Sequence, residues 1–202
     1  MFKKLLLLSV FIGFGVFAAV SEAGVNIGET APDFTLTDSN GKTHALSQYK
    51  GKFVVLEWFN HDCPFVHKHY DSGNMQALQK EYTAKDVVWL SINSSAPGKE
   101  GYYPAEKANE LTQEKDASPT AVLLDEDGKV GKLYGAKTTP HMFVISQQGL
   151  LIYQGAIDNK PSPDAADIPT STNYVKAALE EAIAGKAVSE PSTKSYGCSV
   201  KY

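Results

Sequence analysis

The chain of 202 residues contains no arginine, because all 19 of its basic residues are lysine. Arginine carries a planar guanidinium group that binds a carboxylate or a phosphate through two parallel hydrogen bonds. Its absence excludes any site that depends on that bidentate contact. Cysteine is also scarce, with only Cys63 and Cys198. The formal net charge of −4 at pH 7 gives no indication of nucleic-acid binding.

The longest apolar run is too short to span a membrane as an ordinary helix. It covers residues 5–20, about 16 residues, whereas a spanning helix needs about 20. Two lysines precede the run, and Ser21 and Ala23 follow it, which is typical of a secretory signal peptide. We therefore predict that residues 1–23 are a signal peptide and that the protein is exported, periplasmic or secreted, without a stable membrane anchor. A retained anchor is the alternative.

Cys63 follows an apolar strand predicted over residues 53–59 and precedes a helix predicted to begin at Pro64. A helix N-terminus has unpaired N–H groups and a positive dipole end, which favour the reactive thiolate form of cysteine. This pattern predicts an exposed, redox-active thiol. The alternative is a structural Cys63–Cys198 bridge, because exported proteins with an even cysteine count are normally oxidised.

The remaining pattern predicts one α/β domain over residues 24–187. A hairpin with an Asn40-Gly41 turn precedes the strand that leads to Cys63. Further strands are predicted over 87–93, 121–124, 138–145 and 150–153. Helices are predicted over 64–82, with a break or bend at Gly73, and over 106–115 and 173–184. This order favours a mixed sheet with helices on both faces. Residues 188–202 read as an extended, mobile tail that is long enough to bring Cys198 to Cys63 or to a second subunit in a dimer.

Four segments together resemble a known family: Gly28-Glu-Thr-Ala-Pro-Asp-Phe34, Asn60-His-Asp-Cys-Pro-Phe-Val66, the Thr139-Pro140 step and Gly197-Cys-Ser-Val-Lys201. They are similar to the thioredoxin fold and, within it, to the peroxiredoxin-like redoxins of the alkyl hydroperoxide reductase/thiol-specific antioxidant superfamily. The resemblance implies a central mixed β-sheet flanked by helices, with an N-terminal β-hairpin extension and an extended C-terminal tail. It also implies an oxidoreductase with Cys63 as redox nucleophile and no cofactor.

The chain departs from two motifs of these families. Thioredoxins carry a second cysteine three positions after the nucleophile, where this chain has Val66. Cys63 must therefore be resolved by Cys198, by another protein's thiol or by a small thiol. Peroxiredoxins carry Pro-x-x-x-Thr-x-x-Cys and an arginine, but Leu56 and Asn60 occupy the proline and threonine positions here. Disulfides are thus favoured over peroxides as substrates.

Further site residues follow from the resemblance. Glu57 matches an acidic residue that accepts protons during thiol exchange, and burial would raise its pKa toward useful values. A solvent-facing or lysine-paired Glu57 is the alternative. The Thr139-Pro140 bond is expected to be cis and to help dock an extended substrate beside Cys63. Asn60 is a further candidate for tuning the thiol or binding the substrate.

Three histidines are expected near the thiol. Protonated His61 or His67 would lower the pKa of Cys63, and His141 directly follows Pro140. Alternatively, Cys63 and His67 lie one helical turn apart and with His141 form a copper or zinc site in a chaperone. A non-enzymatic domain with a structural disulfide is the third hypothesis. The leading interpretation remains an exported oxidoreductase acting on protein thiols, small thiols or, less favoured, peroxides.

Overall fold

The computed structural model describes residues 24–202, so the predicted signal peptide lies outside it. Seven strands form one sheet in the order β2-β1-β5-β4-β3-β7-β8, and β6 pairs with β9 in a small second sheet. The strands are β1 (Thr35–Asp38), β2 (Thr43–Ala45), β3 (Val54–Trp58), β4 (Val88–Asn93), β5 (Ala121–Leu124), β6 (Thr138–Thr139), β7 (His141–Ile145), β8 (Leu151–Gly155) and β9 (Cys198–Ser199).

The middle of the sheet is parallel and its edges are antiparallel. Strand β3 runs parallel to β4 and antiparallel to β7, while the β1–β2 hairpin adds to β5 in antiparallel fashion. All five residues of β3 are buried, because helices or loops cover both faces of the central strands. The mixed sheet and the N-terminal hairpin confirm the predicted fold class.

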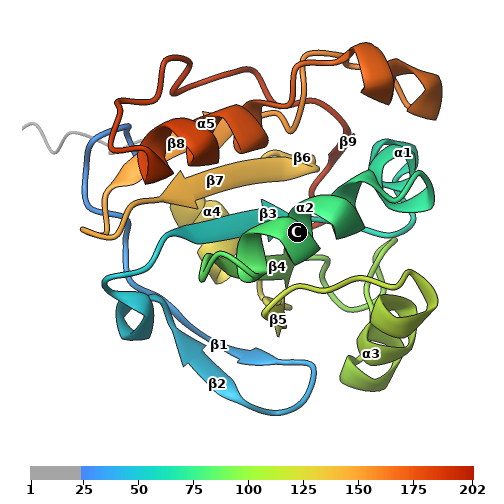
Figure 1. Cartoon of the computed structure of the whole chain (residues 1–202). Helices are drawn as coiled ribbons and strands as arrows, with labels where there is room; N and C mark the ends of the chain where they lie inside the picture. Colours follow the sequence, from blue (N-terminus) through green and yellow to red (C-terminus); the bar gives the residue numbers. More distant parts are fainter. Residues whose placement is uncertain (1–23) are drawn as a thin grey trace, which may run out of the picture.

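Helices lie on both faces of this sheet (Figure 1). They are α1 (Pro64–Asp71), α2 (Asn74–Thr83), α3 (Ala105–Glu114), α4 (Lys129–Tyr134) and α5 (Tyr174–Ile183), with short 3₁₀ turns η1 (Leu46–Tyr49) and η2 (Ala165–Thr170). Apolar side chains of α1, α2, α3 and α5 share one core with Cys63, whereas η1, α4 and the N-terminal segment cover the other face. None of the helices within residues 24–202 is long and apolar enough to cross a bilayer.

Gly73 divides the long helical segment after Cys63 into α1 and α2. Its φ of 77° lies in the left-handed region, which side chains with a Cβ rarely adopt. The sequence predicted this interruption, but it missed α4, whose six residues are too few for a clear helical periodicity.

The C-terminal tail is docked, which corrects the prediction of a mobile segment. It runs back from α5 across the molecule and ends beside β6 (Figure 1). Backbone hydrogen bonds of 3.0 Å join Gln154 in β8 to Pro191 and to Thr193 of the tail. Beyond Cys198 the chain is held by bonds from Val200 N–H to Lys137 O (3.2 Å), from Ala96 N–H to Lys201 O (2.9 Å) and from Tyr202 OH to Ala136 O (2.8 Å).

Candidate active site around Cys63 and Cys198

Cys63 is the N-cap residue of α1, at the end of the loop that leaves β3. Pro64 occupies the first helical position, where its missing N–H costs no hydrogen bond. The Cys63 N–H donates to the Asn60 carbonyl at 3.1 Å and closes the turn. The expected position at a helix N-terminus is therefore found, but Cys63 is 0% exposed. The prediction of an exposed thiol is wrong because the tail covers it.

The tail brings the second cysteine to the first within the same chain. Strand β9 pairs antiparallel with β6, with Cys198 opposite Thr139. The two Sγ atoms lie 2.8 Å apart, and both cysteines are free thiols in the structure. Cys198 is only partly buried. Reaching Cys63 thus requires no second subunit.

The Thr139–Pro140 peptide bond is cis, as the resemblance implied, and it flanks the two sulfurs. The Cys63 thiol donates to the Thr139 carbonyl oxygen at 3.1 Å. Gly197 lies so close to this oxygen that a Cβ on residue 197 would overlap it. A glycine immediately before Cys198 is therefore what lets the tail pack against the cis-proline loop.

The two thiols have opposite pKa shifts. Burial raises the pKa of Cys63, but hydrogen bonding with Cys198 and Thr139 outweighs it, so the pKa lies below its ordinary value. The backbone N–H of Val66 in the first turn of α1 acts in the same direction. Burial and the neighbouring Cys63 sulfur raise the pKa of Cys198 to about 12. Of the two thiols, Cys63 is therefore the one that loses its proton more readily, and Cys198 is the one that keeps it.

A buried network fixes the tail just before Cys198. The Tyr196 hydroxyl donates to the Asp158 carboxylate, and the Lys68 Nζ lies 3.0 Å from the other oxygen of that carboxylate. The side chains of Lys68 and Asp158 are 0% and 1% exposed. Because Lys68 belongs to α1, the network joins the tail to the helix that begins at Cys63.

His69 belongs to the same network and is 0% exposed. Its Nε2 lies 3.4 Å from the Tyr196 hydroxyl, and its Nδ1 contacts the Asn74 amide at 2.8 Å. Burial lowers its pKa to about 4 despite the nearby Asp158 carboxylate. His69 is therefore neutral at pH 7.

Glu57 is fully buried on the face of the sheet that carries Cys63, which contradicts the solvent-facing alternative. Its carboxylate accepts hydrogen bonds from Tyr70 OH, Trp89 Nε1 and Ser91 Oγ, each of 2.8 Å, and from Gln79 Nε2 at 3.3 Å. Burial raises its pKa, and the four donors partly offset this. These bonds run to four neutral side chains and not to either cysteine.

His61 and His67 do not act on the thiol as expected. His61 is buried against Phe59 and Tyr70, with ring centroids 5.0 Å away in each case. Burial lowers its pKa to about 4, so it is neutral at pH 7 and supplies no positive charge. His67 is exposed, and its Nδ1 lies 2.9 Å from the Asp71 carboxylate. Neither histidine is among the main causes of the Cys63 pKa shift.

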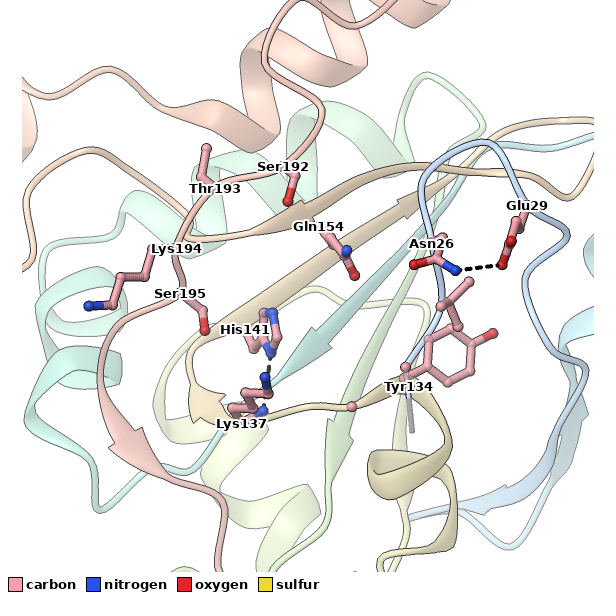
Figure 2. Close-up of a pocket in the computed structure, with 13 residues that line it drawn as sticks. Asn26, Glu29, Tyr134, Lys137, His141, Gln154, Ser192, Thr193, Lys194 and Ser195 are labelled. Atoms are coloured by element: carbon pink, nitrogen blue, oxygen red, sulfur yellow. Dashed lines mark hydrogen bonds between the residues drawn. The ribbon is translucent and has the colours of Figure 1, made fainter. Parts of the chain in front are cut away.

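His141 lies on the other face of the sheet. Its ring contacts Phe143, and its Nδ1 accepts a hydrogen bond from the Lys137 N–H at 3.2 Å. Figure 2 shows it lining a polar pocket with Gln154 and with tail residues 192–195, and neither cysteine lines this pocket. Burial lowers the pKa of His141 to about 4.

The expected metal ligands are therefore not brought together. Cys63 packs in the core on one face of the sheet, His141 faces the opposite core, and His67 points to solvent. Residues 24–202 contain no group of three or more His, Cys, Asp and Glu side chains that could hold a metal ion.

Asn60 shapes the loop before Cys63 and does not contact the sulfurs by a hydrogen bond. Its Oδ1 accepts from the Asp62 N–H at 2.8 Å, and its side chain packs directly on Gly101.

Three residues of the site were not predicted from the sequence. Lys68, Asp158 and Tyr196 are isolated polar positions without a motif. Gly197 carried a usable signal, because it directly precedes the only other cysteine.

Comparisons with known proteins agree with this geometry. The model of the AhpC/TSA family matches residues 27–154. The chain belongs to this family. Among curated proteins, thiol-disulfide oxidoreductase ResA of Geobacillus thermodenitrificans is 29% identical over 72% of this chain and 79% of that protein. Thioredoxin-like protein YneN of Bacillus subtilis is 25% identical over 81% of this chain and 94% of its own length.

The solved structures include a close match in shape. An uncharacterized conserved protein from Geobacillus kaustophilus superposes with a TM-score of 0.75 at 27% identity, covering 88% of this chain and 92% of that one. Family membership and the observed sheet confirm the predicted peroxiredoxin-like redoxin relationship. The AhpC/TSA chain is thus an oxidoreductase with a thioredoxin-like fold.

Proposed function

We propose that this oxidoreductase exchanges thiols and disulfides by opening and closing a bond between Cys63 and Cys198. The observation that carries the proposal is the pair of sulfurs 2.8 Å apart, flanked by a cis-proline loop. The relatives named above as thiol-disulfide oxidoreductases support protein thiols or disulfides as partners. Val66 removes the nearby second cysteine of the thioredoxin loop, and the tail supplies one instead.

The pKa difference within the pair suits this chemistry. Thiolate is the form of cysteine that attacks a disulfide, and a low-pKa thiol is also the better leaving group. Closing the bond converts the Cys63 thiolate and the Cys198 thiol into a disulfide, with loss of two electrons and one proton to the partner. The partner disulfide takes both electrons and the proton and becomes one thiol and one thiolate.

Single-cysteine variants test the proposal. Cys63→Ser and Cys198→Ser should each abolish catalytic reduction of insulin disulfides, while the wild-type protein should form an intramolecular disulfide whose reduction potential lies above about −300 mV. Such a potential keeps the bond reducible by cellular thiols. A bond more reducing than this, or unchanged turnover in both variants, would instead favour a structural disulfide.

Peroxide reduction is not part of the proposal, because the chain has no arginine to polarise a peroxide and no threonine at position 60. Export is part of it, on the sequence pattern of residues 1–23. An exported chain encounters a compartment that favours disulfides, where a cycling pair has both oxidants and clients. N-terminal sequencing of the exported protein should begin at Gly24, and an intact Met1 would contradict removal of the segment.

A further inference from the structure

We propose that partners exchange at Cys198, so that the mixed disulfide with a partner forms on the tail cysteine and Cys63 acts as its internal redox partner. This inference rests on the proposed Cys63–Cys198 cycle and assigns the two cysteines different tasks within it. It reverses the roles expected from the sequence, in which Cys63 attacks the partner and Cys198 resolves the mixed disulfide.

The first argument is access. Cys63 is 0% exposed, whereas Cys198 is partly exposed. A thiolate attacks a disulfide sulfur from the side opposite the bond that breaks, and the accessible sulfur is the one attacked. For Cys198 that side faces away from Cys63. Cys63 itself is a member of the buried apolar cluster that includes Val66 and Tyr70.

The second argument is that the tail segment covering Cys63 is held in place both before and after Cys198 in the sequence. Before it, Tyr196 is bonded to Asp158, which is itself paired with buried Lys68. After it, the last three residues are tied by hydrogen bonds to two separate segments, at Ala96 and at residues 136–137. Gly197 also packs directly against the Thr139 carbonyl. Exposing Cys63 would require all of these contacts to break, whereas exchange at Cys198 requires none.

The third argument concerns the leaving group. When a partner thiolate attacks Cys198 in the oxidised protein, a bond forms between the partner sulfur and Cys198 Sγ while the Cys63–Cys198 bond breaks. Its electron pair leaves with Cys63 as a thiolate. The backbone N–H groups of Cys198 and Val66, which lower the pKa of Cys63, remain available to that thiolate, and a lower thiol pKa speeds departure. A second partner thiol then displaces Cys198, which takes its proton, and the partner leaves as a disulfide.

The reverse direction follows the same path. Cys198 attacks a partner disulfide and passes its proton, through the adjacent Cys63 sulfur, to the departing partner thiolate. Cys63, again a thiolate, then attacks Cys198 Sγ and releases the second partner sulfur as a thiolate. The protein ends with the Cys63–Cys198 bond closed, and the partner has gained two electrons.

The test uses the oxidised wild-type chain and reduced glutathione as the probe thiol. The reaction is stopped with acid at the earliest resolvable times, and free thiols are alkylated with N-ethylmaleimide in denaturant. Trypsin separates the two cysteines, because cleavage after lysine places Cys63 in peptide 53–68 and Cys198 in peptide 195–201. Mass spectrometry then locates the glutathione and the maleimide.

We expect glutathione on Cys198 and maleimide on Cys63, in at least tenfold excess over the opposite pattern. The opposite pattern would overturn this inference but leave the Cys63–Cys198 cycle intact. A protein that forms no disulfide on oxidation would instead contradict the proposed function itself. The three outcomes are therefore distinguishable in one experiment.

A glycine pair tests whether the packed tail decides the choice. Gly197→Ala should force the tail away from the Thr139 carbonyl and let glutathione reach Cys63 as well. Gly149→Ala is the matched control, since Gly149 also has a positive φ but nothing lies near its missing Cβ. The control should keep the wild-type pattern. An unchanged pattern in Gly197→Ala would overturn the role given to the tail.

Discussion

Two buried carboxylates lie near the candidate active site, and their surroundings differ. Glu57, in the middle of β3, accepts hydrogen bonds only from neutral side chains, those of α1, α2 and β4. Asp158, just after β8, has the ammonium group of Lys68 at 3.0 Å and the hydroxyl of the tail residue Tyr196 as partners. One carboxylate is held by dipoles and the other by an opposite charge.

The difference indicates two separate tasks. The hydrogen bonds of Glu57 connect the central sheet with the helices that cover it, so they stabilise the part of the core that carries Cys63. The contacts of Asp158 connect three segments far apart in the sequence, and one of them positions Cys198. A buried ion pair contributes little net stability but penalises any arrangement that separates its members. The Asp158 network therefore specifies where the tail lies.

Removing the counter-charge of Asp158 should have the greatest effect on stability. Lys68→Met keeps a long apolar stem but leaves the Asp158 carboxylate buried without its ammonium partner. Breaking a buried pair in this way costs about 3–5 kcal/mol. We therefore expect the free energy of unfolding, measured by urea titration, to fall by that amount.

The matched control is Lys80→Met, which removes a lysine of α2 that pairs with Asp116 at the surface. These side chains are 52% and 83% exposed, and exposed pairs contribute about 0–1 kcal/mol. If both variants lost equally little stability, the Asp158 carboxylate would not need its buried partner, and the distinction from Glu57 would fail.

A smaller change addresses the tail alone. Tyr196→Phe removes the hydroxyl that donates to Asp158 but keeps the ring that packs on Phe65. A hydrogen bond to a charged group contributes about 1.5–3 kcal/mol. Because this bond positions Cys198, we expect the Cys63–Cys198 disulfide to become easier to reduce. The measurement is its equilibrium constant against glutathione.

The stability of Tyr196→Phe alone would not identify a positioning role, since any buried hydroxyl stabilises the fold. Tyr202→Phe is the control, because its hydroxyl bonds to the Ala136 carbonyl and lies beyond the cysteine. A larger shift of the disulfide equilibrium in Tyr202→Phe than in Tyr196→Phe would contradict the assignment of the Asp158 network.

Most of the central domain could be predicted from the sequence, because its signals are local. The apolar strand ending before Cys63, the Asn40-Gly41 turn and the break at Gly73 each depend on neighbouring residues, and each has its counterpart in the structure. The cis Thr139–Pro140 bond followed from resemblance and was also found. Strand boundaries shifted by one or two residues.

The site was less predictable because burial is set by distant segments. Nothing near Cys63 indicates that the tail covers it, and nothing near His61 or His69 shows that both become buried and neutral. The composition of the tail suggested mobility, yet its contacts come from β8, α1 and the β6 loop. Expectations about charge and exposure therefore failed where long-range packing decided them.

A weaker effect is predicted for Glu57, and it is observed as a dependence of the free energy of unfolding on pH. Glu57→Gln should change stability at pH 7 by no more than about 1 kcal/mol, because the amide oxygen can take the donors on one side. On the other side, the Tyr70 hydroxyl can rotate to accept from the new amide N–H. Urea titrations of both proteins from pH 4.5 to 8 provide the measurement.

The pH dependence separates the two proteins more clearly than the stability at one pH. The folded-state pKa of Glu57 lies above the usual 4.5 because of burial, so its contribution is fully present below pH 4.5. That contribution is lost as the pH rises through the folded-state pKa. The stability advantage of the wild type over Glu57→Gln should therefore shrink with rising pH. The buried histidines contribute equally to the pH dependence of both proteins, so their contributions cancel in the difference.

Glu81→Gln is the control. It should give a small slope of opposite sign, because Lys85 lowers the pKa of Glu81. If the difference in unfolding free energy between the wild type and Glu57→Gln did not change with pH, the hydrogen bonds from the four neutral donors of Glu57 would fully compensate for the water that a buried carboxylate loses.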